Sequence, residues 1–115
     1  MISVPWHRLS SSNEEFTRNS HQLWKGFVSP RTALSYDATR AVIQSLEEQH
    51  KPTRKSTQKT LAGSNFMAEG ATGTIKFHDT GDRHDPPVVL VEVISCSNQQ
   101  YGLAFVPIDN KQCEN

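Results

Sequence analysis

The sequence predicts an α+β fold in which three helices precede a small, mostly antiparallel sheet of three strands. Up to about residue 62, apolar side chains recur at the spacing of amphipathic helices. From about residue 72, the chain changes to alternating or continuous apolar runs that are separated by turn residues. Because helices and strands are segregated along the chain, the sheet is expected to be antiparallel with the helices packed on it.

The first helix is expected to begin in the serine-rich segment 10–15. Ser11 with Glu14, or Ser12 with Glu15, fits a capping box in which each side chain satisfies a free backbone N–H group. Gly26 is expected to end this helix. The side chains expected to share one face are Phe16, Ser20, Leu23 and Trp24.

The second helix is the longest element that the sequence predicts. Ser29 is a good N-cap, and Pro30 in the first helical position loses no hydrogen bond. Its predicted core face consists of Leu34, Ala38, Ala41, Val42 and Leu46, with Ile43 beside them. A short polar helix is then expected from about Thr53 to Ala62, ended by Gly63.

Three strands are expected in the second half of the chain. Residues 72–77 alternate like a half-buried strand, and residues 79–82 form a turn. Residues 88–94 are nearly all apolar or β-branched, which indicates a buried strand. A turn at 97–100 leads into the last strand, residues 101–106.

Composition gives no case for an enzyme, a nucleic-acid-binding protein or a membrane-spanning protein. Twelve basic and twelve acidic residues among 115 cancel, and no apolar run reaches the ~18 residues of a span. A local basic patch at residues 51–59 lacks the interleaved aromatic residues of a nucleic-acid site. No nucleophile and base occur in a familiar catalytic arrangement, and no cofactor is expected.

Two other groups of reactive residues have more than one interpretation. Histidines and aspartates crowd residues 78–85, but their spacing matches neither an EF-hand nor a zinc motif, so a solvated turn is expected. Cys96 and Cys113 are too few for a disulfide framework. A single bridge between them and two free thiols both stay open at this point.

Three stretches in order carry a resemblance to a known family. They are residues 31–38 (RTALSYDA), residues 65–77 (NFMAEGATGTIKF) and residues 79–83 (DTGDR). Together they resemble the last third of type I periplasmic solute-binding proteins, in particular the branched-chain amino-acid and amide receptors of ABC transporters. The resemblance covers about residues 2–107, and residues 108–115 are expected to be a flexible tail.

The resemblance implies a non-enzymatic segment of a two-lobed extracytoplasmic receptor. In that family an amino acid or similar small polar ligand binds between the lobes, and closure about a hinge delivers it to an ABC permease. Most of the ligand-binding groups would then lie upstream of Met1. The small-molecule ligand would therefore bind only to the full-length protein, in the periplasm or another extracytoplasmic compartment.

Three residues of this chain are candidate ligand contacts. Arg31 occupies the position at which branched-chain receptors carry an aromatic residue that lines the cleft, so the chain departs from the family there. An arginine facing the cleft would favour a carboxylate-bearing ligand, although a solvated first-turn arginine is the simpler interpretation. Trp6 and His7 belong to residues 4–7 (VPWH), which resemble the hinge crossing that precedes the helix pair in this family, and Trp6 has the alternative of packing under the first helix.

Two other functions stay open on the sequence alone. The same fold serves as the ligand-sensing domain of signalling receptors and of kinase-fused sensors. A small autonomous protein-interaction domain is the other alternative. A transmembrane or kinase segment beside the chain would indicate the sensor, and a partner captured by the isolated chain would indicate the interaction domain.

Overall fold

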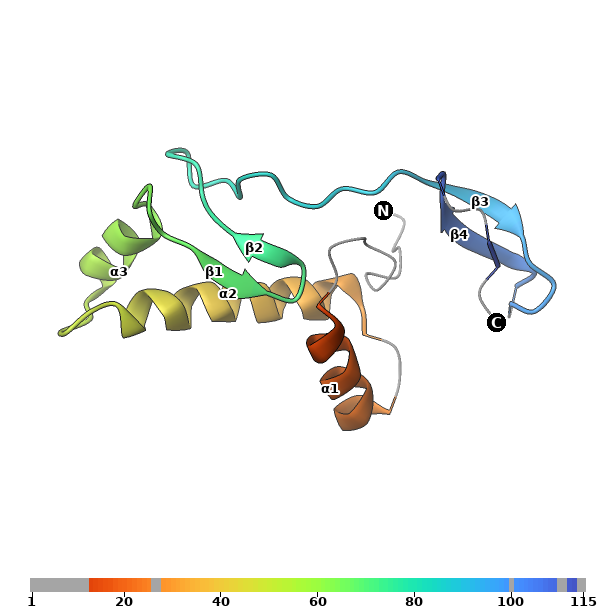
Figure 1. Ribbon diagram of the computed structural model, residues 1–115, viewed down its shortest axis with the longest axis horizontal. Helices are drawn as coiled ribbons and strands as arrows, with labels where there is room; N and C mark the ends of the chain where they lie inside the picture. Colours follow the sequence, from red (N-terminus) through yellow and green to blue (C-terminus); the bar gives the residue numbers. More distant parts are fainter. Residues whose placement is uncertain (1–12, 26–27, 100, 110–111, 114–115) are drawn as a thin grey trace.

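The chain is α+β, as the sequence predicts. The computed structural model describes residues 13–25, 28–99, 101–109 and 112–113. Within this part of the chain the sheet prediction is wrong in detail, because the strands form two separate antiparallel pairs rather than one three-stranded sheet. The elements, drawn in Figure 1, are α1 (Glu14–Trp24), α2 (Pro30–Glu47), α3 (Arg54–Leu61), β1 (Ala68–Gly70), β2 (Gly73–Ile75), β3 (Val91–Ser95) and β4 (Leu103–Pro107).

Helix α1 begins one residue later than the serine caps predict. Asn13 is its N-cap, and the Asn13 side chain accepts a hydrogen bond of 3.1 Å from the Phe16 backbone N–H. The expected capping boxes at Ser11 and Ser12 are therefore wrong. The helix ends at Trp24, and Lys25 adopts the left-handed conformation that often terminates helices.

The predicted starts of the next two helices are confirmed. The Ser29 hydroxyl caps α2 by accepting from the Thr32 N–H at 3.3 Å, and Pro30 occupies the first helical position. Thr53 and Ser56 form a capping box at the start of α3, in which each side chain accepts from the other's backbone N–H. These caps satisfy N–H groups that have no partner within the helix.

Strands β1 and β2 form a tight hairpin that lies along α2 (Figure 1). Ala68 pairs with Ile75 and Gly70 pairs with Gly73, so only two residues make the turn. The sequence predicted one continuous strand over 72–77. The chain instead reverses at residues 71–72, and Gly73 has a positive φ of 98° that glycine adopts without strain.

Strands β3 and β4 form a second hairpin at the far end of the molecule, beyond an extended segment that follows residue 83 (Figure 1). The register pairs Val91 with Pro107 and Ser95 with Leu103. The radius of gyration is 17.0 Å, against about 13 Å for a compact domain of this length. The chain is therefore elongated, with extents of 55 × 30 × 21 Å.

A disulfide between Cys96 and Cys113 braces this second hairpin. Of the two possibilities that the sequence leaves open, a bridge and two free thiols, the structure has the bridge. The bridge joins Cys113, in the segment 108–115 that was expected to be a flexible tail, to Cys96. Cys96 is 1% exposed and packs with Ala104 and Val106. The disulfide is therefore part of a small core on one face of the β3–β4 hairpin.

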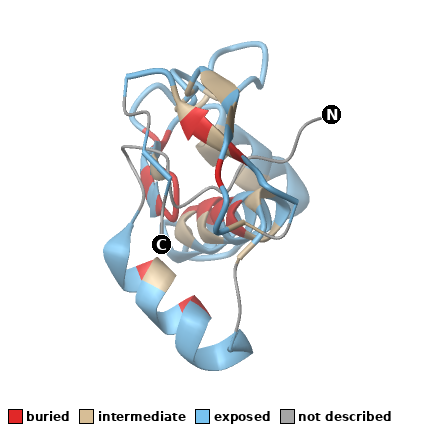
Figure 2. Cartoon of the chain, turned by 90° about the vertical axis from the view of Figure 1, so that its right-hand side faces the viewer, coloured by how far each residue is buried: buried red, intermediate tan, exposed pale blue. Residues whose placement is uncertain are grey.

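The buried residues are few and separate into three small clusters (Figure 2). One joins α1, α2 and the β1–β2 turn through Phe16, Ala33 and Ala71. The second joins α2 to the β1–β2 hairpin and the residues before it, and the third is the disulfide cluster. No helix in the described part of the chain has the length and apolar content needed to cross a membrane.

The predicted core face of α2 is confirmed at Ala41 and wrong for its larger side chains. The helix buries Ala33, Asp37, Ala41 and Ser45, whose small side chains let the β1–β2 hairpin and α3 approach closely. The larger apolar side chains lie on the neighbouring face and are exposed: Leu34 by 55%, Val42 by 44% and Leu46 by 39%. The prediction for α1 is confirmed for Phe16 and Ser20, which are buried, and wrong for Leu23 and Trp24, which are exposed.

Candidate functional site

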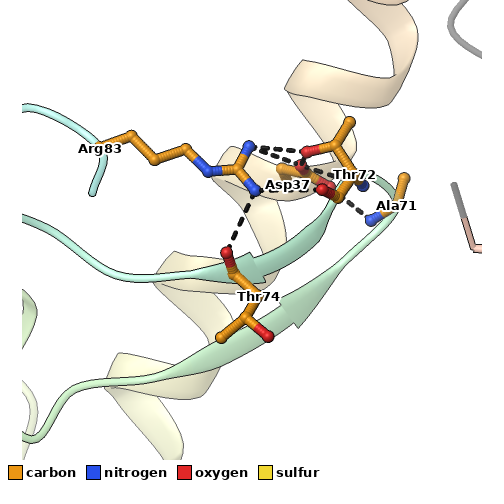
Figure 3. Close-up of polar contacts among 5 residues, drawn as sticks. All are labelled: Asp37, Ala71, Thr72, Thr74 and Arg83. Atoms are coloured by element: carbon orange, nitrogen blue, oxygen red, sulfur yellow. Dashed lines mark hydrogen bonds and ion pairs between the residues drawn. The ribbon is translucent and has the colours of Figure 1, made fainter. Parts of the chain in front are cut away.

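A buried carboxylate on α2 is the centre of the most extensive polar arrangement that the structure describes. Asp37 is 4% exposed and faces the turn of the β1–β2 hairpin (Figure 3). One carboxylate oxygen accepts from the Ala71 N–H at 2.5 Å. The other accepts from the Thr72 N–H at 3.3 Å and from the Thr72 hydroxyl. Asp37 therefore holds the hairpin turn against the helix.

Arg83 completes this arrangement from the turn that follows β2 (Figure 3). Its Nη1 atom lies 3.2 Å from the Asp37 carboxylate and donates to the Thr72 hydroxyl at 2.6 Å. Its Nη2 atom donates to the Thr74 carbonyl at 3.3 Å. The Arg83 side chain is only 16% exposed, so the pair lies largely away from solvent. The Asp37 cluster is hereafter Asp37, Ala71, Thr72, Thr74 and Arg83.

The hydroxyl of Thr72 forms hydrogen bonds to both charged groups, the Asp37 carboxylate and the Arg83 guanidinium. It donates its proton to the Asp37 carboxylate and accepts from the Arg83 guanidinium. A hydroxyl has one donor and two acceptor positions, so both contacts are compatible. Charge-assisted hydrogen bonds of this kind are stronger than neutral ones, and a chain of them fixes the geometry of the residues that it joins.

Gly70 is required by the close approach of the hairpin to α2. A Cβ atom at this position would lie 2.4 Å from an Asp37 carboxylate oxygen and 2.8 Å from the Ile75 side chain. The absence of a side chain thus makes room for the carboxylate beside the hairpin backbone. The Gly70–Gly73 segment that carries the resemblance is therefore explained by packing around Asp37.

The Asp37 cluster joins α2, the turn of the β1–β2 hairpin and the segment around Arg83. Four donors converge on the two oxygens of Asp37, so both oxygens are hydrogen-bonded within the chain. Thr72 and Asp37 are both buried, and the Thr72 hydroxyl also accepts from the Arg83 guanidinium.

The sequence-predicted site residues are not brought together in the part of the chain that the structure describes. Arg31 is exposed in the first turn of α2 and does not belong to the Asp37 cluster. Trp6 and His7 lie outside the described residues. Sequence reasoning missed the role of Arg83, which is 46 residues from Asp37. The signal that points to it is its place at the end of the third stretch that carries the resemblance.

An open hollow of about 510 Å³ lies between α1 and α2. Trp24, Tyr36 and Arg40 contribute to its walls, together with Glu15 from the first turn of α1. The volume suits a small ligand, but ligand pockets normally bury most of the ligand surface. Trp24 and Tyr36 are 55% and 40% exposed, so this hollow is too open to enclose one.

The acidic and histidine-rich turn near residue 80 is solvent-exposed, in line with its interpretation from sequence. His84 Nδ1 lies 2.9 Å from an Asp85 carboxylate oxygen, and the His78 and His84 rings lie 4.5 Å apart between centroids. Across the described ranges, no three His, Cys, Asp or Glu side chains are arranged to hold a metal ion.

No family model, no curated protein and no solved structure matches this chain.

Proposed function

We propose that this chain is the C-terminal portion of a type I solute-binding receptor, which captures an amino acid or similar small polar ligand for an ABC transporter. The observation that supports the proposal is the Asp37 cluster. Each of the three stretches that carry the resemblance contributes to it: Asp37 from the first, Ala71, Thr72 and Thr74 from the second, and Arg83 from the third. The three stretches, which are far apart in the sequence, thus meet in one cluster of hydrogen bonds.

Within such a receptor this chain supplies scaffold rather than the ligand-binding groups. The Asp37 cluster ties a helix, a hairpin turn and a following loop into one body, which is what a lobe that moves as a rigid unit about a hinge requires. The groups that recognise the ligand's carboxylate and amine lie upstream of Met1 in this proposal. Arg31, Trp6 and His7 are the local contributors, and no step of a reaction is assigned to any of them.

The disulfide supports an extracytoplasmic location. Disulfide bonds persist in the periplasm and outside the cell, whereas thiols are kept reduced in most cytosolic compartments. Cys96 is buried in the hairpin core and is joined to the exposed Cys113 across 17 residues. This agrees with a receptor that meets its ligand in the periplasm.

The proposal is tested on the parent polypeptide that contains these residues. Its thermal unfolding is followed with each free amino acid and its amide at millimolar concentration, with neutral sugars as the control set. A receptor that binds one of them at 100 times its Kd gains about 2.7 kcal/mol, which raises the midpoint by several degrees. A rise with an amino acid or amide and none with sugars is expected. No shift with any amino acid or amide would overturn the ligand class.

A further inference from the structure

Two histidines in the turn after β2 have no part in the Asp37 cluster and lie side by side. The turn is a short antiparallel ribbon in which Phe77 pairs with Arg83. On either side of that pair, the backbone N–H groups of His78 and His84 donate across the ribbon at 2.8 Å. Side chains alternate between the two faces of paired strands. Arg83 therefore faces the Asp37 cluster (Figure 3), while His78 and His84 share the other face.

The two imidazole rings are spaced like two ligands of a single metal ion. Their centroids lie 4.5 Å apart. Two imidazoles that bind one ion through metal–nitrogen bonds of about 2.0–2.1 Å, at about 90–110° to each other, have centroids roughly 4.5–5 Å apart. Both side chains are exposed, so each ring has room to turn about its side-chain bonds and direct a nitrogen at a common ion.

Asp85 orients the ring of His84. The His84 Nδ1 atom lies 2.9 Å from an Asp85 carboxylate oxygen. A neutral imidazole that donates from Nδ1 presents the lone pair of Nε2 as an acceptor. Histidines that bind metals almost always donate their other ring N–H to a carboxylate, a carbonyl or water, which fixes the orientation of the ring. The contact with Asp85 therefore leaves Nε2 of His84 as the metal ligand.

The charges around the histidine pair favour a cation. Of the two basic residues in this turn, Arg83 is used by the Asp37 cluster, and Lys76 has an exposed, flexible side chain that extends into solvent. The same turn carries three exposed carboxylates, those of Asp79, Asp82 and Asp85. The acidic groups thus outnumber the basic ones around the pair.

The type of ligand determines which ions fit. Imidazole nitrogen suits Zn²⁺, Cu²⁺ and Ni²⁺, whereas Ca²⁺ and Mg²⁺ take oxygen ligands. The described residues offer no group of three His, Cys, Asp or Glu side chains, so the protein supplies two ligands and water fills the other positions.

We propose that His78 and His84 form a two-histidine surface site for a divalent transition-metal ion such as Zn²⁺ or Cu²⁺, with Asp85 as the partner of His84. An ion held by both rings joins the two arms of the ribbon that presents Arg83 to the Asp37 cluster. The site does not depend on the proposed receptor function, because all of its groups belong to this turn.

Calorimetric titration of the untagged 115-residue chain with Zn²⁺, in a buffer that does not bind the metal, tests the site. His78→Gln and His84→Gln each remove one imidazole and keep a polar side chain. Each is expected to weaken Zn²⁺ binding by ~10-fold or more, because one ligand of a chelating pair is lost. His50→Gln is the matched control. His50 is exposed and lies outside the turn, so its loss is expected to change binding by less than about twofold.

The imidazole proton NMR signals of the unsubstituted chain give a second measurement, which does not depend on how a variant folds. Zn²⁺ is expected to shift the signals of His78 and His84 together and to leave that of His50 in place. Ca²⁺ at the same concentration is expected to shift none of them. Unchanged Zn²⁺ binding in both turn variants would overturn the proposal, and so would a shift of the His50 signal as large as those of the pair.

Discussion

Replacing Asp37 with alanine is expected to lower the free energy of unfolding of the part of the chain that contains α2, α3 and the β1–β2 hairpin by about 3–5 kcal/mol. The substitution removes the acceptor for four donors and leaves the Arg83 guanidinium, 16% exposed, without its carboxylate. The Ala71 and Thr72 N–H groups lose their partner in a site that solvent barely reaches. Denaturant titration followed by the helical circular dichroism signal measures the loss.

Two further variants separate the loss of the cluster from a general effect of removing a carboxylate. Asp79→Ala removes an exposed aspartate from the turn, and it is expected to change stability by less than about 0.5 kcal/mol. Asp37→Ala combined with Arg83→Met is expected to cost less than the two single changes together, because the buried charge is then absent. A loss below about 1 kcal/mol for Asp37→Ala alone would contradict the role assigned to the cluster.

Breaking the disulfide is expected to unfold the β3–β4 hairpin locally while the helices remain folded. A two-stranded hairpin is at best marginally stable in water, and this one packs a core of only Cys96, Ala104 and Val106 with Ile94 against it. A bridge that closes a loop of about this length contributes roughly 3 kcal/mol. Cys113→Ser is therefore expected to reduce amide protection in β3 and β4 by about 100-fold.

Amide exchange of α2 is the internal control for that measurement. The hairpin lies at the far end of the elongated molecule from the α2–α3 contact, so exchange in α2 is expected to stay unchanged (Figure 1). Unchanged protection of β3 and β4 in Cys113→Ser would contradict the stabilising role of the bridge. Loss of protection in α2 as well would show that the two regions unfold together.

Local chemistry explains which parts of the fold the sequence could predict. Ser29 and Pro30, or Thr53 followed by Ser56, mark a helix start through contacts within one turn, and both starts were found from the residues alone. Asn13 shows the limit of this reasoning. Several capping residues in a row compete, and the sequence alone did not choose among them.

The faces of the helices could not be predicted in this way. Periodicity shows that Leu34, Val42 and Leu46 share a face, but it does not show what covers that face. In this chain the β1–β2 hairpin packs on the neighbouring face instead, because Asp37 accepts from its turn and Gly70 allows close approach. The burial pattern is therefore decided by a polar contact 34 residues away along the chain, which no local pattern contains.

The Asp37 cluster itself was only partly visible in the sequence. Tyr36-Asp37-Ala38, the Gly70–Gly73 segment and the Asp79–Arg83 turn each stood out, but their spacing carries no information on mutual contact. The disulfide was undecided for the same reason, because two cysteines 17 residues apart are compatible with a bridge and with two free thiols. Three-dimensional proximity was the missing information in both cases.

Calorimetric titration of the 115-residue chain with free amino acids tests most directly that it holds the scaffold of a receptor and not its ligand-binding groups. The polar contacts of the Asp37 cluster are made to this chain's own residues, and the described hollow between α1 and α2 is open to solvent. We expect no binding tighter than roughly millimolar. Micromolar binding of any amino acid to this chain alone would contradict the account.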